Sequence, residues 1–450
     1  MYDMNDGETH KTWKRQLFCV SGAAQDLDES IILHRDVIDL MPDGHPGRSS
    51  SLTNLANSLI TRFKRSGGAE DLDEPISLHH QALDLCPNGH PDRSAMLCNF
   101  ANSLLFRFEQ SGGREDLDES ITLHRAALDL CPDGHPYRST SLNNLANSLI
   151  TRFGQSGSNE DLCESIALHR SALNLYPDGH HELCASLSNL AASLLTRFEQ
   201  HGDSKDLDES ISLHRNALDL LPRGHPGRYM CLNDLANTLI TRFKQSGGRG
   251  DLDESISLYR EALVLCPHGH PYRSTPLHNL ANPLFTCFEQ SGRSEDLDES
   301  ISLFRDALNL LVDDPDRSML LSNLASSLKK RFEQGGSDED LDESISLNRT
   351  ALDLRIDGHP NRSTSLNNLG TSLFARFQRR GAREDLDEAI SRHRVALDLR
   401  PDGHPERSTS LNNLAISLFT RFQQSGSYED LEESISLFQA ALHRSYQRSS

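Results

Sequence analysis

The chain has 450 residues, and 45 Lys and Arg against 66 Asp and Glu give a formal net charge of −21. This acidity argues against a nucleic-acid partner, because contacts to phosphates need clustered Lys and Arg. No stretch approaches the roughly 18 uninterrupted apolar residues of a transmembrane helix, and residues 1–16 lack the apolar core of a signal peptide. Nine Cys without a C-x-x-C pair are typical of free thiols in a reducing compartment. We therefore expect a cytoplasmic protein with no membrane partner.

A repeat runs through the chain. The string D-L-x-E begins at Asp26, Asp71, Asp116, Asp161, Asp206, Asp251, Asp296, Asp340, Asp385 and Asp430. Eight of the nine steps between these positions are 45 residues long, and the ninth, at Val312–Pro315, is 44. Self-similarity at this period predicts a solenoid, in which each unit buries its apolar face only against its neighbours.

In chain order, residues 1–25 are predicted to hold a partial repeat, the stump of a first helix. Phe18 and the Ser21-Gly22 pair lie one period before Phe63 and Ser66-Gly67. Residues 26–441 then hold ten second helices and nine first helices, and residues 442–450 form a short polar tail. Because the repeat is cut abruptly at both ends, we expect either a longer parent array or end-to-end self-association.

The segment that starts at each D-L-x-E predicts the second helix of a unit. Side chains recur there at helical spacing, as at Leu117, Ile121, His124 and Leu128. Asp116, with Glu119 three residues on, is predicted as the N-cap. The helix should end where Gly134 takes a left-handed conformation, and Pro136 should open the next helix.

The segment from about residue 136 to 155 predicts a longer first helix of about 20 residues. Its apolar stripe is Leu142, Leu145, Ala146, Leu149 and Phe153, and Ser156-Gly157 closes it. The same Phe recurs in all nine first helices and is predicted to anchor the core between layers. Pro283 falls inside one of these helices and should kink it at a cost of about 3 kcal/mol.

The pattern resembles the tetratricopeptide repeat. Residues 388–401 are similar to the second helix of that family and its closing proline, with Ala389, Ala396 and Pro401 at the small-residue and proline positions. Residues 366–370 resemble its first helix. The long period is closest to kinesin light chains and to fungal arrays that often precede a CHAT protease domain. The resemblance implies an all-α fold, a right-handed superhelical solenoid of antiparallel helix pairs.

Two rows of asparagines are the candidate binding residues. The first row holds Asn54, Asn99, Asn144, Asn189, Asp234, Asn279, Asn323, Asn368 and Asn413, and the second holds Asn57, Asn102, Asn147, Asn237 and Asn282. An Asn inside a helix lowers helix stability by about half a kcal/mol relative to Ala, so its recurrence at one position needs a physical reason. The resemblance implies that the first row grips the backbone of an extended peptide. The rival interpretation is that these amides tie adjacent helices together, and for the second row we favour simple solvent exposure.

Histidine and arginine also recur, but structural roles are favoured for both. Six His lie in second helices and eight in the loops before the first helices. One His per unit cannot supply a closed set of metal ligands, and Tyr259, Phe304 and Phe438 replace the helix His elsewhere. We expect the loop His to cap helices. A further hypothesis is that protonation of these His at acidic pH loosens the array. The Arg that precedes most of these Phe residues should pair with D-L-D-E carboxylates.

These features predict a non-enzymatic scaffold that binds a peptide or partner protein along a concave groove lined by asparagines. No catalytic residue, metal site or cofactor is predicted, because no nucleophile constellation or phosphate loop is present. The alternative is the sensor or regulatory region of a larger signalling protein whose catalytic domain, such as a CHAT protease, is absent from this chain.

Overall fold

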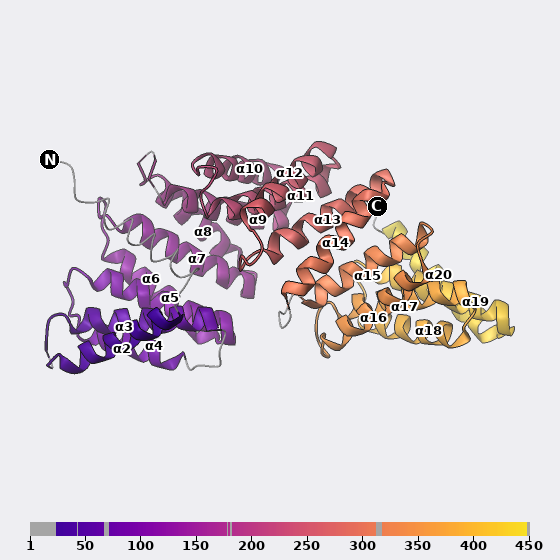
Figure 1. The fold of residues 1–450 in the computed structure, drawn as a ribbon, viewed down its shortest axis with the longest axis horizontal. Coiled ribbons are helices and arrows are strands. Elements are labelled where there is room, and N and C mark those ends of the chain that lie inside the picture. The colour runs from indigo at the N-terminus through magenta and orange to yellow at the C-terminus, as the bar shows by residue number, and fades with distance from the viewer. Residues whose placement is uncertain are drawn as a thin grey trace. The chain divides into compact units, whose positions relative to one another are not determined.

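The computed structural model describes residues 24–42, 44–66, 72–177, 179–180, 182–311 and 317–447. Within these residues the secondary structure is helical throughout, without a strand (Figure 1). The prediction of an all-α solenoid of paired helices is confirmed. Residues 1–23 of the predicted stump at residues 1–25 lie outside the described residues.

First and second helices alternate along the described chain. The first helices are α3 (Arg48–Ser66), α5 (Arg93–Ser111), α7 (Arg138–Ser156), α9 (Leu183–His201), α11 (Arg228–Ser246), α13 (Ser274–Ser291), α15 (Arg317–Glu333), α17 (Arg362–Arg380) and α19 (Arg407–Ser425). The second helices are α2 (Ala24–Leu40), α4 (Asp73–Asp84), α6 (Arg114–Asp129), α8 (Asn159–Leu173), α10 (Ser204–Asp219), α12 (Arg249–Leu265), α14 (Ser294–Leu310), α16 (Asp338–Asp353), α18 (Arg383–Asp398) and α20 (Tyr428–Gln447).

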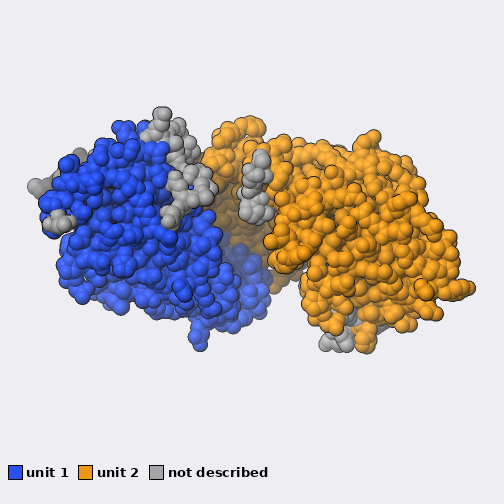
Figure 2. Space-filling view, turned by 90° about the horizontal axis from the view of Figure 1, so that it is seen from below, with its two compact units in different colours: residues 1–220 blue, residues 221–450 orange. Residues whose placement is uncertain are grey.

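The chain divides into two compact units, residues 1–220 and residues 221–450 (Figure 2). The described helices α2–α10 belong to the first unit and α11–α20 to the second. In both units each first helix packs most extensively against the second helix that follows it. This pairing is the helical hairpin that the sequence period predicts.

The two layers within each unit are spaced differently. Backbones of successive first helices approach each other directly, as in α5, α7 and α9 or α13, α15 and α17. Between successive second helices in the described chain there is no such backbone approach, so side chains alone bridge them. First helices therefore form the more closely spaced layer of each unit.

Core clusters extend over neighbouring repeats. In the first unit, Phe108 at the end of α5 packs with Leu117 and Ile121 of α6 and with Leu145 and Leu149 of α7. Phe153, Leu162, Ile166, Leu190 and Leu194 form the same cluster one period later. Since each cluster takes residues from two repeats, a single repeat does not bury its own apolar face.

The predicted N-cap at Asp116 is wrong. Helix α6 begins at Arg114, with Gly113 as the N-cap in an extended conformation at φ −68° and ψ 102°. Gly112 ends the preceding helix at φ 75°, in the left-handed region that glycine tolerates. This glycine turn starts the helix three residues earlier than predicted, so Asp116 lies within the first turn.

One prediction about proline differs from the structure. Pro136 lies in a turn, and α7 begins at Arg138, whose backbone N–H donates to the His135 carbonyl at 3.1 Å. Gly134, by contrast, takes the expected left-handed conformation at φ 84°. Pro283 lies where the sequence places it, buried inside α13, which runs from Ser274 to Ser291; the kink there stays a prediction.

Candidate peptide-binding face

Both asparagine rows lie on the polar stripe of the first helices, opposite the apolar stripe. In α7 this stripe contains Asn144 and Asn147, three residues apart and therefore neighbours on one helix face. Across the first row, Asn54 is exposed and the other members are half-buried. In the second row Asn147 is half-buried and the rest are exposed.

Some of these amides join neighbouring elements. The Asn323 side-chain amide of α15 donates to the Asn282 Oδ1 of α13 at 3.2 Å. Asn413 of α19 donates in the same way to Asn367 of α17 at 3.1 Å. Asn237 accepts from the Tyr259 hydroxyl at 2.6 Å. At these positions the amides tie adjacent helices together, as the rival interpretation of the sequence predicts.

Other members of the first row keep their hydrogen-bonding capacity. Within the described chain, no side-chain hydrogen bond is formed by Asn54, Asn99, Asn189, Asn279 or Asn368. Each such amide offers two donors and an acceptor at the surface of the first-helix layer. These five repeats therefore each present one free amide that can bind the backbone of a peptide ligand.

Asp234 is the acidic exception in the first row. Its carboxyl is half-buried in α11, and burial raises its pKa to about 6. Burial penalises the charged form, and no cation opposes that penalty here. The carboxylate therefore destabilises the folded chain fully above about pH 6. This destabilisation shrinks as the pH falls below 6 and is gone only below the pKa of about 3.9 that the group has in the unfolded chain.

Replacing Asp234 by Asn, the residue of the equivalent repeats, is expected to stabilise the second unit near neutral pH. Because the side chain is partly solvated, we expect a gain of about 1–2 kcal/mol. Urea unfolding at about pH 7.5 and pH 4.5 would check this, since the gain should fall to about a third at the lower pH, which still lies above the pKa of the unfolded chain. A gain of the same size at both pH values would contradict the assigned cause.

Five helix histidines lie in the core, contrary to the usual exposure of this residue type. They are His79, His124, His169, His214 and His393, each no more than 2% exposed. Burial lowers the pKa of each to about 4, so all five are neutral at pH 7. His169 shares a hydrogen bond of 2.9 Å with Asn143, whose amide donates to Ser186 at 2.7 Å.

The loop histidines cap the turns before the first helices. In each case Nδ1 accepts a hydrogen bond from the backbone N–H two residues later, at 3.1–3.3 Å; the eight are His45, His90, His135, His180, His225, His270, His359 and His404. This geometry is the capping role that the sequence predicts. Within the described residues no group of three or more His, Cys, Asp or Glu is arranged to hold a metal ion.

In five repeats the Arg before the recurrent Phe binds two second helices at once. Arg376 of α17 donates from Nε and Nη2 to Asp385 of α18 at 2.8 and 2.7 Å, and from Nη1 to Asp342 of α16 at 3.0 Å. We call this arrangement the arginine clamp; it is also formed by Arg107, Arg152, Arg331 and Arg421. The first D-L-x-E aspartate is thus a clamp ligand.

A second set of ion pairs links successive second helices. Arg125 of α6 lies 2.8 Å from Glu164 of α8, and the pair recurs as Arg35–Glu74, Arg170–Glu209, Arg260–Glu299, Arg305–Glu343, Arg349–Glu388 and Arg394–Glu433. These pairs are largely exposed, so each contributes little to stability. They do bridge the gaps that backbone packing leaves open in the second-helix layer.

Comparison with known proteins identifies the repeats. The family model described as tetratricopeptide repeat matches residues 183–227, 230–272 and 362–406. These three segments are therefore tetratricopeptide repeats, as the sequence pattern predicts. No curated protein matches the chain. No described helix is both long and apolar enough for a membrane span.

Solved structures of repeat proteins also align with the chain. One contains the nearly identical TPR-like repeats of a candidate kinesin light chain of P. anserina, with 19% identity, 48% of this chain and 98% of that chain covered, and a TM-score of 0.35. YrrB, described as a TPR protein with an unusual peptide-binding site, has 18% identity, 48% and 92% coverage and a TM-score of 0.32. The human IFIT1 dimer with m7Gppp-AAAA has 14% identity, 95% and 96% coverage and a TM-score of 0.39.

Proposed function

We propose that this chain is a non-enzymatic, cytoplasmic scaffold that binds an extended segment of a partner protein along its first-helix layer. The observation that carries this proposal is the set of first-row asparagines whose amides have no side-chain partner in the described chain, such as Asn99 and Asn189. Half-buried amides are already restrained by packing, so a ligand backbone loses less entropy in pairing with them.

Two further features favour the first-helix layer as the binding surface. Its helices are the more closely spaced, which makes this layer the inner side of a curved stack, and concave surfaces hold ligands best. An amide can also donate to a peptide carbonyl and accept from a peptide N–H, so it recognises extended backbone of any sequence.

Replacing Asn99, Asn144 and Asn189 together by Ala is expected to remove most peptide binding. A library of short random peptides displayed on phage, selected against the full chain, supplies the probe. Losing the two free amides, Asn99 and Asn189, at about 1 kcal/mol each should weaken the selected peptides roughly thirtyfold. Fluorescence anisotropy with the labelled peptides measures the change, and circular dichroism checks that helicity is retained.

The matched control replaces Gln110, Gln155 and Gln200 by Ala in the same three helices. These side chains are exposed and lie outside the asparagine rows, so peptide affinity should be unchanged. Unchanged affinity in the asparagine variant would contradict the proposal. Loss of helicity in that variant would instead assign the asparagines a structural role.

A further inference from the structure

One first helix departs from the repeat on its exposed side. In α11, Tyr229 stands at a position that is Ser in seven of the nine first helices: Ser49, Ser94, Ser139, Ser274, Ser318, Ser363 and Ser408. Asp234 is the single acid in the first asparagine row. Met230 is 55% exposed and lies four residues before Asp234, so the two side chains share one face of α11.

Tyr229 forms a cluster of rings with the loop before α13. Its ring centre lies 5.9 Å from that of Tyr272 at an interplanar angle of 19°, and 5.5 Å from that of His270 at 73°. Tyr272 is 57% exposed, so much of its ring faces solvent. Burial, followed by the neighbouring Tyr272, Cys266 and Asp234, raises the pKa of the Tyr229 hydroxyl. The carboxyl of Asp234 thus lies within electrostatic range of the ring cluster.

The carboxylate of Asp234 has no partner in the part of the chain that the structure describes. It forms neither an ion pair nor a side-chain hydrogen bond there. Burial and then the charge of Asp234 raise the pKa of the Tyr259 hydroxyl, but this hydroxyl donates to Asn237 at 2.6 Å. The Thr238 hydroxyl donates to the backbone carbonyl of Asp234 at 2.8 Å. Residues 229–241 contain no Lys or Arg, so the negative charge stays uncompensated.

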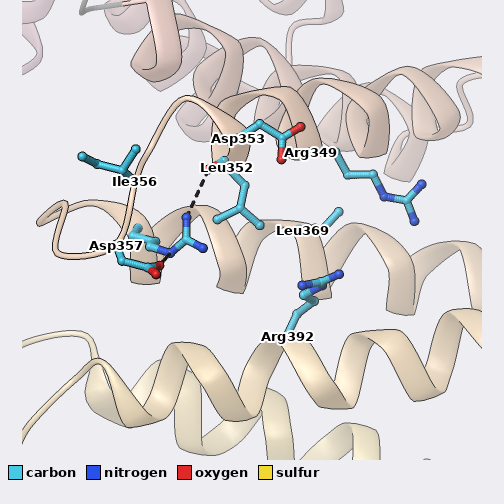
Figure 3. A pocket seen from close by; sticks show the side chains of 8 residues that line it. Arg349, Leu352, Asp353, Ile356, Asp357, Leu369 and Arg392 are labelled. Atoms are coloured by element: carbon cyan, nitrogen blue, oxygen red, sulfur yellow. Dashed lines mark hydrogen bonds and ion pairs between the residues drawn. The ribbon is translucent and has the colours of Figure 1, made fainter.

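The hollow between α16 and α18 shows, by contrast, a balance of charge (Figure 3). Three arginines and three acids lie around it: Arg349, Arg362, Arg392, Asp353, Asp357 and Glu388. Arg362 pairs with Asp357 at 3.1 Å, and Glu388 lies 2.7 and 3.2 Å from the other two guanidiniums. A charged ligand therefore gains no uncompensated partner in that hollow, whereas a cation gains one at Asp234.

We propose that Asp234, Tyr272 and Met230 form a cation subsite that binds a basic side chain, Arg or Lys, of the extended segment held by the first-helix layer. This inference rests on the proposed function and adds charge recognition to the backbone contacts of the asparagines. The basic group pairs with the Asp234 carboxylate and lies against the exposed Tyr272 ring, whose π face attracts cations. Its aliphatic stem packs on Met230. The net charge of −21 favours a basic segment over an acidic one.

The test selects short random peptides on the full chain at about pH 7.5. We expect Arg or Lys to be enriched at one peptide position, with Arg ahead because a guanidinium both stacks and pairs bidentately. The selected peptides should bind Asp234→Asn about tenfold more weakly, and Tyr272→Ala about threefold more weakly. Replacing the basic peptide residue by Gln should match the effect of Asp234→Asn, and the two changes together should cost no more than either alone.

Weaker binding to Asp234→Asn would not come from unfolding, because this change is expected to stabilise the chain, and a melting curve checks this. The matched control adds Asn368→Asp to Asp234→Asn, which returns the charge to the first row in α17, away from the rings. This control should not restore binding.

Two results would separate this inference from the proposed function. Peptides that are weakened by Asn279→Ala but not by Asp234→Asn overturn the cation subsite and leave backbone binding in place. Restored affinity in the Asn368→Asp control also overturns the subsite, because overall acidity would then account for the basic preference. If neither asparagine changes nor Asp234→Asn weaken any selected peptide, the proposed function and the subsite are both wrong.

Discussion

Acidification from about pH 7.5 to about pH 5.5 is expected to unfold the first unit of this protein before the second. Four of the five buried neutral histidines, His79, His124, His169 and His214, lie in the first unit, and only His393 lies in the second. Burial lowers the pKa of each to about 4, against about 6.5 in an unfolded chain.

The direction of this effect follows from proton binding. Since the unfolded state binds protons more tightly, stability is complete above about pH 6.5 and is lost as the pH falls from there toward 4. At pH 5.5 each histidine costs about 1.4 kcal/mol, so the first unit loses roughly four times as much as the second. Asp234, whose pKa is raised to about 6, acts in the opposite direction in the second unit.

Hydrogen exchange followed by mass spectrometry at the two pH values would resolve the units. Amides of α4–α10 should lose protection at the lower pH, while those of α14–α20 keep most of theirs. Replacing His124, His169 and His214 by Phe, which stands at this position as Phe304, should remove most of the pH dependence. Equal loss of protection in both units, or unchanged pH dependence in the triple variant, would contradict the assignment.

The repeat period and the apolar stripes were sufficient to predict the helix pairs, because both signals are copied ten times and each reflects burial. Local capping rules were less reliable. Asp116 satisfies the capping-box pattern, yet its carboxylate binds Arg107 of the preceding helix at 2.6 and 2.7 Å. A bidentate ion pair between helices competes with the local cap, and the pattern of one helix alone does not contain that competitor.

Most of the features that were not predicted from the sequence lie at single residues that depart from the repeat. Arg392 stands where the other nine second helices carry Leu, and this contrast was a visible signal of the hydrogen bonds that its guanidinium donates to Glu388. The buried guanidinium of Arg400 was not predictable, because its partners Ser363, Ser410 and Glu406 come from three other positions. The asparagine rows were found by position, but which amides would be free depended on contacts between repeats.

The arginine clamp is expected to be a major source of stability within each unit, and Arg376→Cys should show this most clearly. The substitution leaves Asp385, 7% exposed, without its bidentate partner. Removing one member of a buried ion pair costs about 3–5 kcal/mol, because the remaining charge stays desolvated. In contrast to the exposed Arg–Glu pairs of the second-helix layer, the clamp should therefore be costly to break. Hydrogen exchange of α17 and α18 amides would measure the loss.

The repeat around α13 supplies a compensating change. There Cys287 stands at the clamp position, and Arg293, at the N-cap of α14, lies 3.1 Å from Asp296. The double variant Arg376→Cys with Ala382→Arg copies this arrangement into α17 and α18. It should recover much of the hydrogen-exchange protection lost in Arg376→Cys, since the new guanidinium approaches Asp385 from the N-terminal end of α18. Arg376→Cys with Asp385→Asn should recover part of it by removing the buried charge. If neither second change restored protection, the loss would come from missing side-chain packing, and the electrostatic role of the clamp would be wrong.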